Sequence, residues 1–339
     1  MLKRLVALVA GAGLGLGLAA SAAQAQEVNV YTYREPALIK PLLDKFTAET
    51  GVKVNTLFAA DGLEERIATE GAGSPADLLI SVDVARLTRG VELGIAQRFD
   101  DPVLDKAVPA AFRDPDGFWY GLSSRARVVY ASKERVKQTT IRYEDLADPV
   151  WKGRICIRSG QHPYNLGLFG AMIAKLGPEK ATVWLTGLKA NLARRPSGAD
   201  RDVAKDIAAG LCDIGVGNTY YVGLMQQDPV QKEWAAAINV IMPTFGDSGG
   251  TQINISGMIL AKNAPNRDSA IKLAEWLVSD EAQRLYAEVN FEYPVKPGIP
   301  VAPAVAAFGT VKPDTLPLTE IARTRKAASE MVDQVGFDN

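Results

Sequence analysis

The chain is organised around one stretch, Cys212-Asp213-Ile214-Gly215-Val216-Gly217-Asn218-Thr219-Tyr220-Tyr221. Its first five residues form a short apolar run that predicts a buried strand, and Gly217 and Asn218 are turn residues. A helical pattern resumes at Val222. The stretch therefore places two adjacent phenols where a strand becomes a helix. In an open α/β sheet this is the position at which ligands bind.

The tyrosine pair has two interpretations. Two adjacent tyrosines in a turn point in different directions, yet both can reach one small object in a cleft. Phenol oxygens suit a hard, highly charged metal ion. The alternative is that Tyr220 and Tyr221 are half-buried packing residues whose hydroxyls stay wet, which is the commoner role of tyrosine.

The first 25 residues are typical of a secretory signal peptide. Lys3 and Arg4 form a positive start, the run from Leu5 to Ala20 is apolar, and Ala23-Gln24-Ala25 is a cleavage site of the A-x-A type. We expect cleavage after Ala25 and a periplasmic mature protein. A retained anchor is the alternative, although the apolar run is short for a membrane span.

Charge and composition exclude several classes of function. Without Lys3 and Arg4 the chain has 36 basic and 39 acidic residues, a net charge of −3, which argues against nucleic acid or an anionic membrane as partner. The only histidine is His162, which leaves little hydrolytic machinery. Residues 246–250, Gly-Asp-Ser-Gly-Gly, look like a serine nucleophile motif, but Pro243 interrupts the run before Ser248. We therefore predict a glycine-rich loop there and no enzyme activity.

Strands and helices alternate along the chain. Apolar alternation predicts strands at residues 28–31, 52–58, 78–81, 154–157 and 253–260. Helical spacing predicts helices at residues 37–50, 62–70, from 84, 166–175, 179–190, 203–209, 270–278, 281–288 and 319–334. Residues 28–81 are predicted to alternate strand, helix, strand, helix, strand. This order predicts a parallel sheet.

A long strand over residues 119–130 is predicted to cross between two α/β lobes. Crossing strands make a hinge with a cleft between the lobes, where small ligands commonly bind. We predict an α/β, two-lobed fold of the periplasmic-binding-protein type. Cys156 and Cys212 are both assigned to strands, and an even cysteine count in an oxidising compartment favours a disulfide. Two buried thiols on nearby strands are the alternative.

Four phenols lie at three strand-to-helix turns. Tyr33 follows the first strand of lobe one, Tyr164 follows the first strand of lobe two, and Tyr220 and Tyr221 follow a later strand of lobe two. A ferric ion can deprotonate bound phenols although free tyrosine has a pKa near 10. Nearby guanidinium groups would balance the phenolates. The arginines in suitable positions, each with a surface salt bridge as the alternative, are Arg34, Arg125, Arg127 and Arg158.

Short stretches spread over nearly all of the mature chain carry a family resemblance. They are Val30-Tyr31 to Phe46-Thr47, residues 121–127, 143–149, 151–154 and 157–159, Tyr164-Asn165, residues 217–221, 255–257 and 264–267, and Glu292-Tyr293-Pro294-Val295. On these stretches the chain resembles the periplasmic ferric-iron-binding proteins of bacterial ABC transporters, the transferrin-like FbpA/FutA group. The resemblance implies a type II binding-protein fold with two hinge strands. It divides the chain into lobe one at 26–125 and 251–302, lobe two at 126–250, and a helical segment at 303–339 that returns to lobe two.

The resemblance implies three iron ligands in lobe two, Tyr164, Tyr220 and Tyr221. In lobe one the family often places His-Tyr just after the arginine that Arg34 matches, whereas this chain has Glu35-Pro36. Either Tyr33 or Glu35 is expected to substitute. Otherwise lobe one contributes only Arg34 or Arg125, and water or a carbonate-like anion completes the shell. The residues expected around the ligands or a synergistic anion are Arg34, Arg125, Arg158 and Ser159, with His162 as a further neighbour of Tyr164.

The function expected from the resemblance is ferric iron transport. The protein would bind Fe³⁺, with Fe²⁺ as the alternative, and deliver it as a monomer to an inner-membrane ABC permease and its ATPase. One rival is a protein of the same fold for an organic or anionic solute such as a polyamine, thiamine or phosphonate. The tyrosines would then be stacking walls, and Arg158, Ser159 and Gly160 would form an anion nest. A second rival is a secreted hydrolase that uses Ser248.

Overall fold

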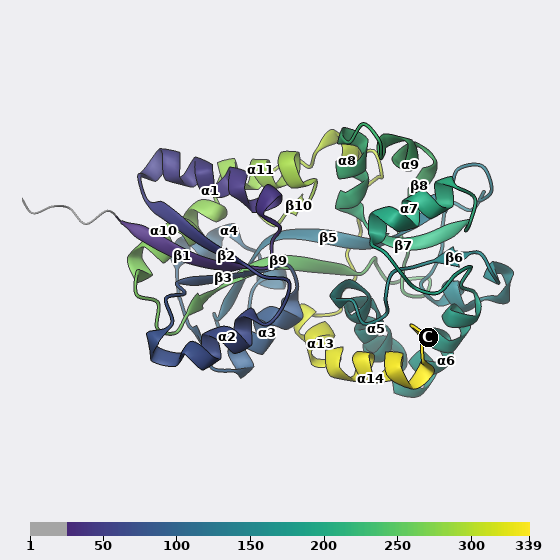
Figure 1. The fold of residues 1–339 in the computed structure, drawn as a ribbon, viewed down its shortest axis with the longest axis horizontal. Coiled ribbons are helices and arrows are strands. Elements are labelled where there is room, and N and C mark those ends of the chain that lie inside the picture. The colour runs from purple at the N-terminus through teal and green to yellow at the C-terminus, as the bar shows by residue number, and fades with distance from the viewer. Residues whose placement is uncertain (1–25) are drawn as a thin grey trace, which may run out of the picture.

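Two lobes lie side by side in the computed structural model, which describes residues 26–339 (Figure 1). The predicted signal peptide, residues 1–25, lies outside the described residues. Strands β5 (Trp119–Ser132) and β9 (Ile253–Ala261) run between the lobes. The predicted α/β, two-lobed fold is confirmed. Along residues 26–339 no helix combines the length and apolar character that crossing a bilayer requires.

Lobe one, the lobe with β1, is built on a sheet with the strand order β2-β1-β3-β9-β5. Strand β1 (Glu27–Thr32) pairs in parallel with β2 (Lys53–Phe58) and β3 (Leu78–Ser81), whereas β9 is antiparallel to β3 and β5. Its short strands are β4 (Ala96–Gln97) and β10 (Tyr293–Pro294). Its helices are α1 (Pro36–Thr50), α2 (Leu63–Glu70), α3 (Val84–Glu92), α4 (Pro102–Ala107), α10 (Arg267–Leu277) and α11 (Asp280–Asn290).

Helix α1 illustrates how local signals set element boundaries. It begins with proline at its first position, where the missing N–H has no intrahelical partner, and ends at Gly51. Gly51 has φ 72°, the left-handed conformation that glycine adopts without penalty. The face between these ends buries Leu42, Leu43 and Phe46 against the sheet. This boundary agrees with the prediction.

Lobe two continues the sheet through the order β5-β7-β6, with β8 also paired to β5. Its strands are β6 (Ile155–Cys156), β7 (Ile214–Asn218) and β8 (Ile238–Ile241). The helices on this side of the molecule are α5 (Pro163–Leu176), α6 (Pro178–Ala190), α7 (Asp200–Ala208), α8 (Thr219–Gln227), α9 (Lys232–Ala236), α12 (Pro303–Ala306), α13 (Leu318–Arg323) and α14 (Arg325–Val335). Helices α13 and α14 lie on α5, and α13 also touches α3 of lobe one. The predicted lobe boundaries remain predictions.

The turn predicted at Gly217 and Asn218 is wrong. Strand β7 extends through Asn218, which pairs with Arg127 of β5, and α8 begins at Thr219 rather than at Val222. Gly217 is a glycine for packing reasons, because a Cβ there would lie 2.2 Å from the Tyr130 ring. Glycine is favoured both at a chain turn and where a neighbouring side chain packs closely on a strand. The sequence alone does not distinguish these two reasons.

Three other sequence predictions are settled by the coordinates. The single helix predicted at 319–334 is two helices, α13 and α14, which meet at Thr324. The disulfide between Cys156 and Cys212 is confirmed, with Cα atoms 5.8 Å apart, although Cys212 precedes β7 rather than lying in it. Ser248 lies in a turn, as predicted, where a Cβ on Gly249 would meet the Phe245 carbonyl oxygen at 2.2 Å.

Candidate metal centre

Two neighbouring strands bring three phenols to one edge of the sheet. Strands β6 and β7 pair in parallel, so their carboxyl ends lie together. The chain after β6 leads to Tyr164, the second residue of α5, and the end of β7 leads directly to Tyr220 and Tyr221 in the first turn of α8. The disulfide joins the same two strand segments.

Tyr220 contacts both of the other phenols. The hydroxyl oxygens of Tyr164 and Tyr220 are 3.1 Å apart. The rings of Tyr220 and Tyr221 have centroids 4.2 Å apart and planes inclined by 35°. These are the three tyrosines that the resemblance names for lobe two, and the fold brings all three together.

Burial controls the protonation of this cluster. Tyr220 is 3% exposed. Burial raises the pKa of Tyr220 well above its usual value of 10, and the nearby Tyr164 and Tyr221 raise it further. Burial also raises the pKa of Tyr221, with Tyr164 and Asp200 adding to the effect. Both phenols therefore carry their protons at neutral pH in the metal-free protein.

The phenols face a cavity of about 240 Å³ between the lobes. Lobe two contributes Tyr164, Arg201, Tyr220, Tyr221 and Leu224 to its wall. Lobe one contributes Tyr33, Arg34, Glu35, Ala37, Leu38 and Val82, which come from the start of α1 and the end of β3. The cavity is thus lined by residues of both lobes.

The hydroxyl of Tyr33 is not directed to the other phenols. It donates to the buried carboxylate of Glu64 and accepts the N–H of Leu63 at 2.6 Å. Leu63 is the first residue of α2, where a backbone N–H lacks an intrahelical partner. The Arg86 guanidinium lies 3.7 Å from the centroid of the Tyr33 ring. Tyr33 lines the cavity, but its hydroxyl already bonds to Glu64 and Leu63 of α2, which argues against this candidate ligand.

Glu35 is the more accessible lobe-one candidate. It is exposed, lines the cavity, and precedes α1 without a hydrogen bond from its carboxylate to the helix end. Its backbone carbonyl instead accepts the N–H groups of Leu38 and Ile39. The backbone of Glu35 is therefore held by α1, whereas its carboxylate makes no capping hydrogen bond to that helix.

Arg34 is fixed to the crossing strands by buried hydrogen bonds. Its two terminal nitrogens each lie 2.9 Å from one carboxylate oxygen of Glu292, and one of them also contacts the Ser256 hydroxyl. Glu292 accepts a further hydrogen bond from Ser123 of β5. Ser256 belongs to β9, so the ion pair ties the start of α1 to both crossing strands. This bidentate buried pair is a strong, orienting interaction.

Asp200 holds two of the arginines that lie beneath the phenols. Its buried carboxylate pairs with Arg127 and, at 3.3 Å, with Arg158, and it accepts the backbone N–H of Asn218. Burial alone would raise the pKa of Asp200, but Arg127 and Arg158 hold it below its usual value. The carboxylate therefore stays ionised. Sequence reasoning missed Asp200, and its place at the start of α7 was the only available signal.

Three cationic N–H groups near Tyr164 lack hydrogen-bond partners. They are Nη1 of Arg125, Nε of Arg127 and Nε of Arg158. The guanidinium carbons of these arginines lie 5.3, 6.0 and 5.5 Å from the centroid of the Tyr164 ring. The other terminal nitrogen of Arg125 donates to the backbone carbonyl of Val82. A buried donor without a partner is unfavourable, so a negative oxygen placed here would be stabilised.

Ser159 does not face the cavity as an anion donor. Its hydroxyl donates to the Asp338 carboxylate at 2.6 Å, and the Gly160 N–H donates to the same carboxylate at 2.7 Å. The anion nest proposed for a rival solute is therefore filled by the chain itself. The Ser159 hydroxyl is thus already paired with Asp338.

His162 positions Tyr164 without titrating near neutral pH. Its Nδ1 accepts the backbone N–H of Tyr164 at 3.2 Å and so caps α5. Burial, with the nearby Arg158, lowers the pKa of His162 to about 3. Its ring meets the Tyr164 ring edge-on with centroids 4.6 Å apart.

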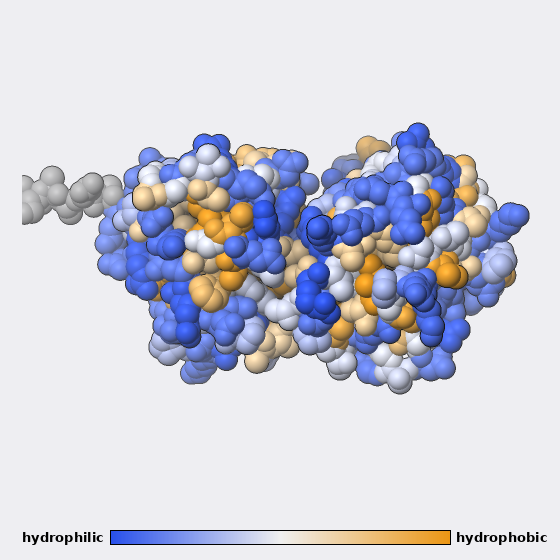
Figure 2. Space-filling view, turned by 90° about the horizontal axis from the view of Figure 1, so that it is seen from below, coloured by the Kyte–Doolittle hydropathy of each residue, from blue (hydrophilic) through white to orange (hydrophobic). Residues whose placement is uncertain are grey.

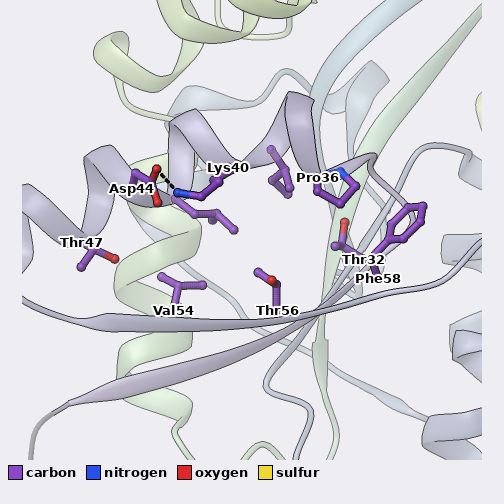
Figure 3. Close-up of a pocket in the computed structure, with 10 residues that line it drawn as sticks. Thr32, Pro36, Lys40, Asp44, Thr47, Val54, Thr56 and Phe58 are labelled. Carbon is purple, nitrogen blue, oxygen red and sulfur yellow. Dashed lines mark hydrogen bonds and ion pairs between the residues drawn. The ribbon is translucent and has the colours of Figure 1, made fainter.

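Other hollows differ chemically from this site. Figure 2 shows the surface hollowed between the lobes, and a cavity of about 800 Å³ on that side is lined by α2, α3, α13 and α14. Figure 3 shows a pocket between α1 and β2, lined by Thr32, Thr56, Phe58 and the ion pair of Lys40 with Asp44. Among residues 26–339, no group of three or more His, Cys, Asp or Glu side chains is arranged to hold a metal ion. The phenol cluster is thus the candidate centre.

Comparisons with known proteins agree on one family. The family model described as bacterial extracellular solute-binding protein matches residues 73–311. Iron uptake protein A1 of Synechocystis sp. is 42% identical over 314 residues, which cover 91% of this chain and 87% of that protein.

Solved structures agree in fold and sequence. The apo ferric ion-binding protein A of Pasteurella haemolytica has a TM-score of 0.90 and 50% identity, covering 93% of this chain and 99% of that chain. A Trichodesmium protein in complex with iron and citrate ligands has a TM-score of 0.86 and 40% identity. The match covers 92% of this chain and 99% of that chain. The chain belongs to the bacterial extracellular solute-binding protein family, in the group of the periplasmic ferric-iron-binding proteins.

Proposed function

We propose that this protein binds ferric iron in the periplasm through the phenolates of Tyr164, Tyr220 and Tyr221 and delivers it to an inner-membrane ABC permease and its ATPase. The observation that carries the proposal is the 3.1 Å separation of the Tyr164 and Tyr220 hydroxyls inside an interlobe cavity. Neighbouring oxygens around an octahedral ion with bonds of about 2 Å lie about 2.8 Å apart. The metal-free geometry is therefore close to what two adjacent ligand positions need.

Charge balance supports Fe³⁺ as the cargo. Three phenolates neutralise three positive charges, and phenolate oxygen favours a hard ion over Fe²⁺. The unpartnered N–H groups of Arg125, Arg127 and Arg158 would then stabilise an additional anion such as carbonate beside the ion. Glu35 is the lobe-one group that reaches the cavity without an existing hydrogen bond to a helix end. We assign it the closing contact.

The proposal involves binding and release, without covalent chemistry. The relatives are named for iron uptake and ferric iron binding, and the family is one of solute-binding proteins, which supports delivery to a transporter. The protein would act as a monomer, because the three phenols and Glu35 all line one cavity of a single chain. Closure of lobe one over lobe two would exclude water from the bound ion.

The test is titration of the metal-free mature protein with a ferric chelate. We expect one iron per chain and an orange to red colour from phenolate-to-iron charge transfer, both lost in a variant with Tyr164, Tyr220 and Tyr221 changed to phenylalanine. A colourless wild-type protein that takes no iron from ferric citrate would contradict the proposal. Calorimetry with a polyamine, thiamine and a phosphonate on the same sample would then test the rival solutes.

A further inference from the structure

The last residues of the chain are bound to the loop that carries Tyr164. The Asp338 carboxylate accepts three hydrogen bonds, from the Ser159 hydroxyl at 2.6 Å and from the backbone N–H groups of Gly160 at 2.7 Å and Gln161 at 3.4 Å. The Asp338 carbonyl accepts a further bond from Arg195. Asp338 lies 178 residues from Gly160 in the sequence.

Apolar packing around Phe337 also holds residues 336–338 against this loop. Phe337 is fully buried and meets Phe169 of α5 edge-on, with centroids 5.6 Å apart. Gly160 lies directly under it, because a Cβ at Gly160 would come within 2.7 Å of the Phe337 ring. Gly336, at φ 61°, ends α14 and turns these two residues onto the loop. Glycine is the residue suited to that left-handed position.

A second contact from α14 holds the same loop. The Gln161 side chain donates to the Asp333 carboxylate at 2.8 Å and to the Ser329 carbonyl at 3.0 Å, and it accepts the Ser329 hydroxyl at 2.7 Å. The loop is therefore held along its length by the C-terminal helix and its tail.

A short chain of hydrogen bonds connects this attachment to Tyr164. The backbone N–H of His162 donates to the Ser159 carbonyl at 3.2 Å, and the backbone N–H of Tyr164 donates to Nδ1 of the His162 ring at 3.2 Å. The Asn165 side chain donates to the carbonyls of Arg158 and Ser159, each at 3.0 Å. A shift of Ser159 therefore moves both the cap of α5 and the start of the helix that presents the phenol.

Tyr164 needs such support more than the other two phenols. Tyr220 and Tyr221 follow β7 directly and begin α8, so the sheet fixes them. Six residues, 157–162, separate β6 from α5, and Tyr164 is half-buried. A ligand at the end of a loop is held less rigidly than one at the end of a strand unless other groups support it.

We propose that Asp338 is a positioning residue for the metal centre, and that the docked tail Gly336–Asp338 sets the direction of the Tyr164 phenol. This proposal rests on the proposed function for its metal readout, but not for its structural one. The carboxylate acts through the loop and makes no contact with the ion. Outer groups that orient metal ligands are worth roughly 10–100-fold in metal affinity.

The experiment compares Asp338→Ala with Asp338→Asn and with Glu330→Ala in the full mature chain. Asparagine keeps one acceptor oxygen for Gly160, so it should restore part of the effect. Glu330 lies on α14, its side chain is 67% exposed, and its ion-pair partner is the exposed Lys326, so it is the matched control. The first readout is amide hydrogen exchange at Gly160, Gln161, Tyr164 and Asn165 in metal-free protein. Exchange there should be roughly tenfold faster in Asp338→Ala, from the loss of charge-assisted hydrogen bonds, and unchanged in Glu330→Ala.

The second readout is the ferric complex. Asp338→Ala should bind iron about 10–100-fold more weakly and shift the charge-transfer band, because one phenolate meets the ion at a changed angle. A purely structural role would lower the unfolding midpoint and leave the band of the bound iron unchanged, which would overturn the proposal. Unchanged exchange at Tyr164 would also overturn it. If the wild type binds no iron, the proposed function fails, and the exchange data still decide whether the tail holds the loop. If Asp338→Ala does not fold, the same comparisons apply to Asp338→Asn.

Discussion

The wall of the cavity that belongs to lobe two and the wall that belongs to lobe one hold their polar groups in opposite ways. In lobe two, Tyr164 and Tyr220 already touch, and their supports are a disulfide and the buried carboxylate of Asp200. In lobe one, Tyr33 is occupied by α2, Arg34 is fixed to the hinge, and the exposed Glu35 is free to move. The lobe-two phenols thus meet one another at the cavity, whereas in lobe one Tyr33 and Arg34 are bound to other groups and Glu35 is exposed.

This difference has a thermodynamic reason. A site that is ordered before binding loses less conformational freedom when the ligand arrives, so it binds more tightly for the same contacts. Hinge closure requires the other wall to move, and a second set of rigid ligands would have to be aligned in both positions. A two-lobed carrier that must also release its cargo is therefore expected to concentrate affinity in one lobe. Four measurements test that division, beginning with the largest expected effect.

Acid should weaken iron binding steeply, through the phenols of lobe two. The raised pKa values of Tyr220 and Tyr221 mean that at least two protons must leave when the ion binds. Affinity should therefore fall at least about 100-fold per pH unit, or at least about 10⁴-fold from pH 7.5 to 5.5, at constant free ferric ion activity. Tyr220→Phe should lower this slope by about one proton. A wild-type slope below two protons would contradict ligation by both phenols.

Removing the disulfide should destabilise lobe two. Cys156 and Cys212 are separated by 56 positions. A disulfide that closes a loop of this length lowers the entropy of the unfolded chain, so its removal should lower the free energy of unfolding by about 4 kcal/mol. The double Cys→Ala variant should show this loss in urea unfolding. The same variant should also release iron faster, because the bond joins the strands that carry the phenols. Full retention of stability would show that the strands need no covalent link.

Single phenol deletions should separate the two walls. Tyr220→Phe should weaken ferric affinity by more than roughly 100-fold, since a ligand is worth more than the groups that orient it. Tyr33→Phe is the matched control. It removes the bonds to Glu64 and Leu63, so it should lower stability by about 1–3 kcal/mol but leave iron affinity within about threefold of wild type. Equal losses of affinity would restore Tyr33 as a ligand.

The smallest effect is expected at Glu35. If its carboxylate only approaches the closed site, Glu35→Gln should change ferric affinity within roughly fivefold, the size of an exposed charge interaction. Isothermal competition against a ferric chelator measures this. A loss as large as that of Tyr220→Phe would make Glu35 a direct ligand and lobe one an equal partner in binding.

Local reasoning predicted the phenols of lobe two for a physical reason. Tyr164, Tyr220 and Tyr221 follow strands, and parallel strands end at a common edge, so their meeting follows from topology. Tyr33 also follows a strand, yet Glu64 and the start of α2, 31 and 30 positions later, take its hydroxyl. Nothing near Tyr33 in the sequence reveals that competition.

The sequence by itself determined the α/β alternation, the crossing strand, the cysteine pair and the strand ends that carry phenols, because periodicity and turn chemistry act over a few residues. Only the tertiary structure decided which polar groups were already occupied. Ser159 is bound by Asp338, 179 positions away, and Gly217 is a glycine because Tyr130 packs on it. Hydrogen-bond partners and close contacts of this kind join segments that lie far apart in the sequence, so local patterns do not reveal them.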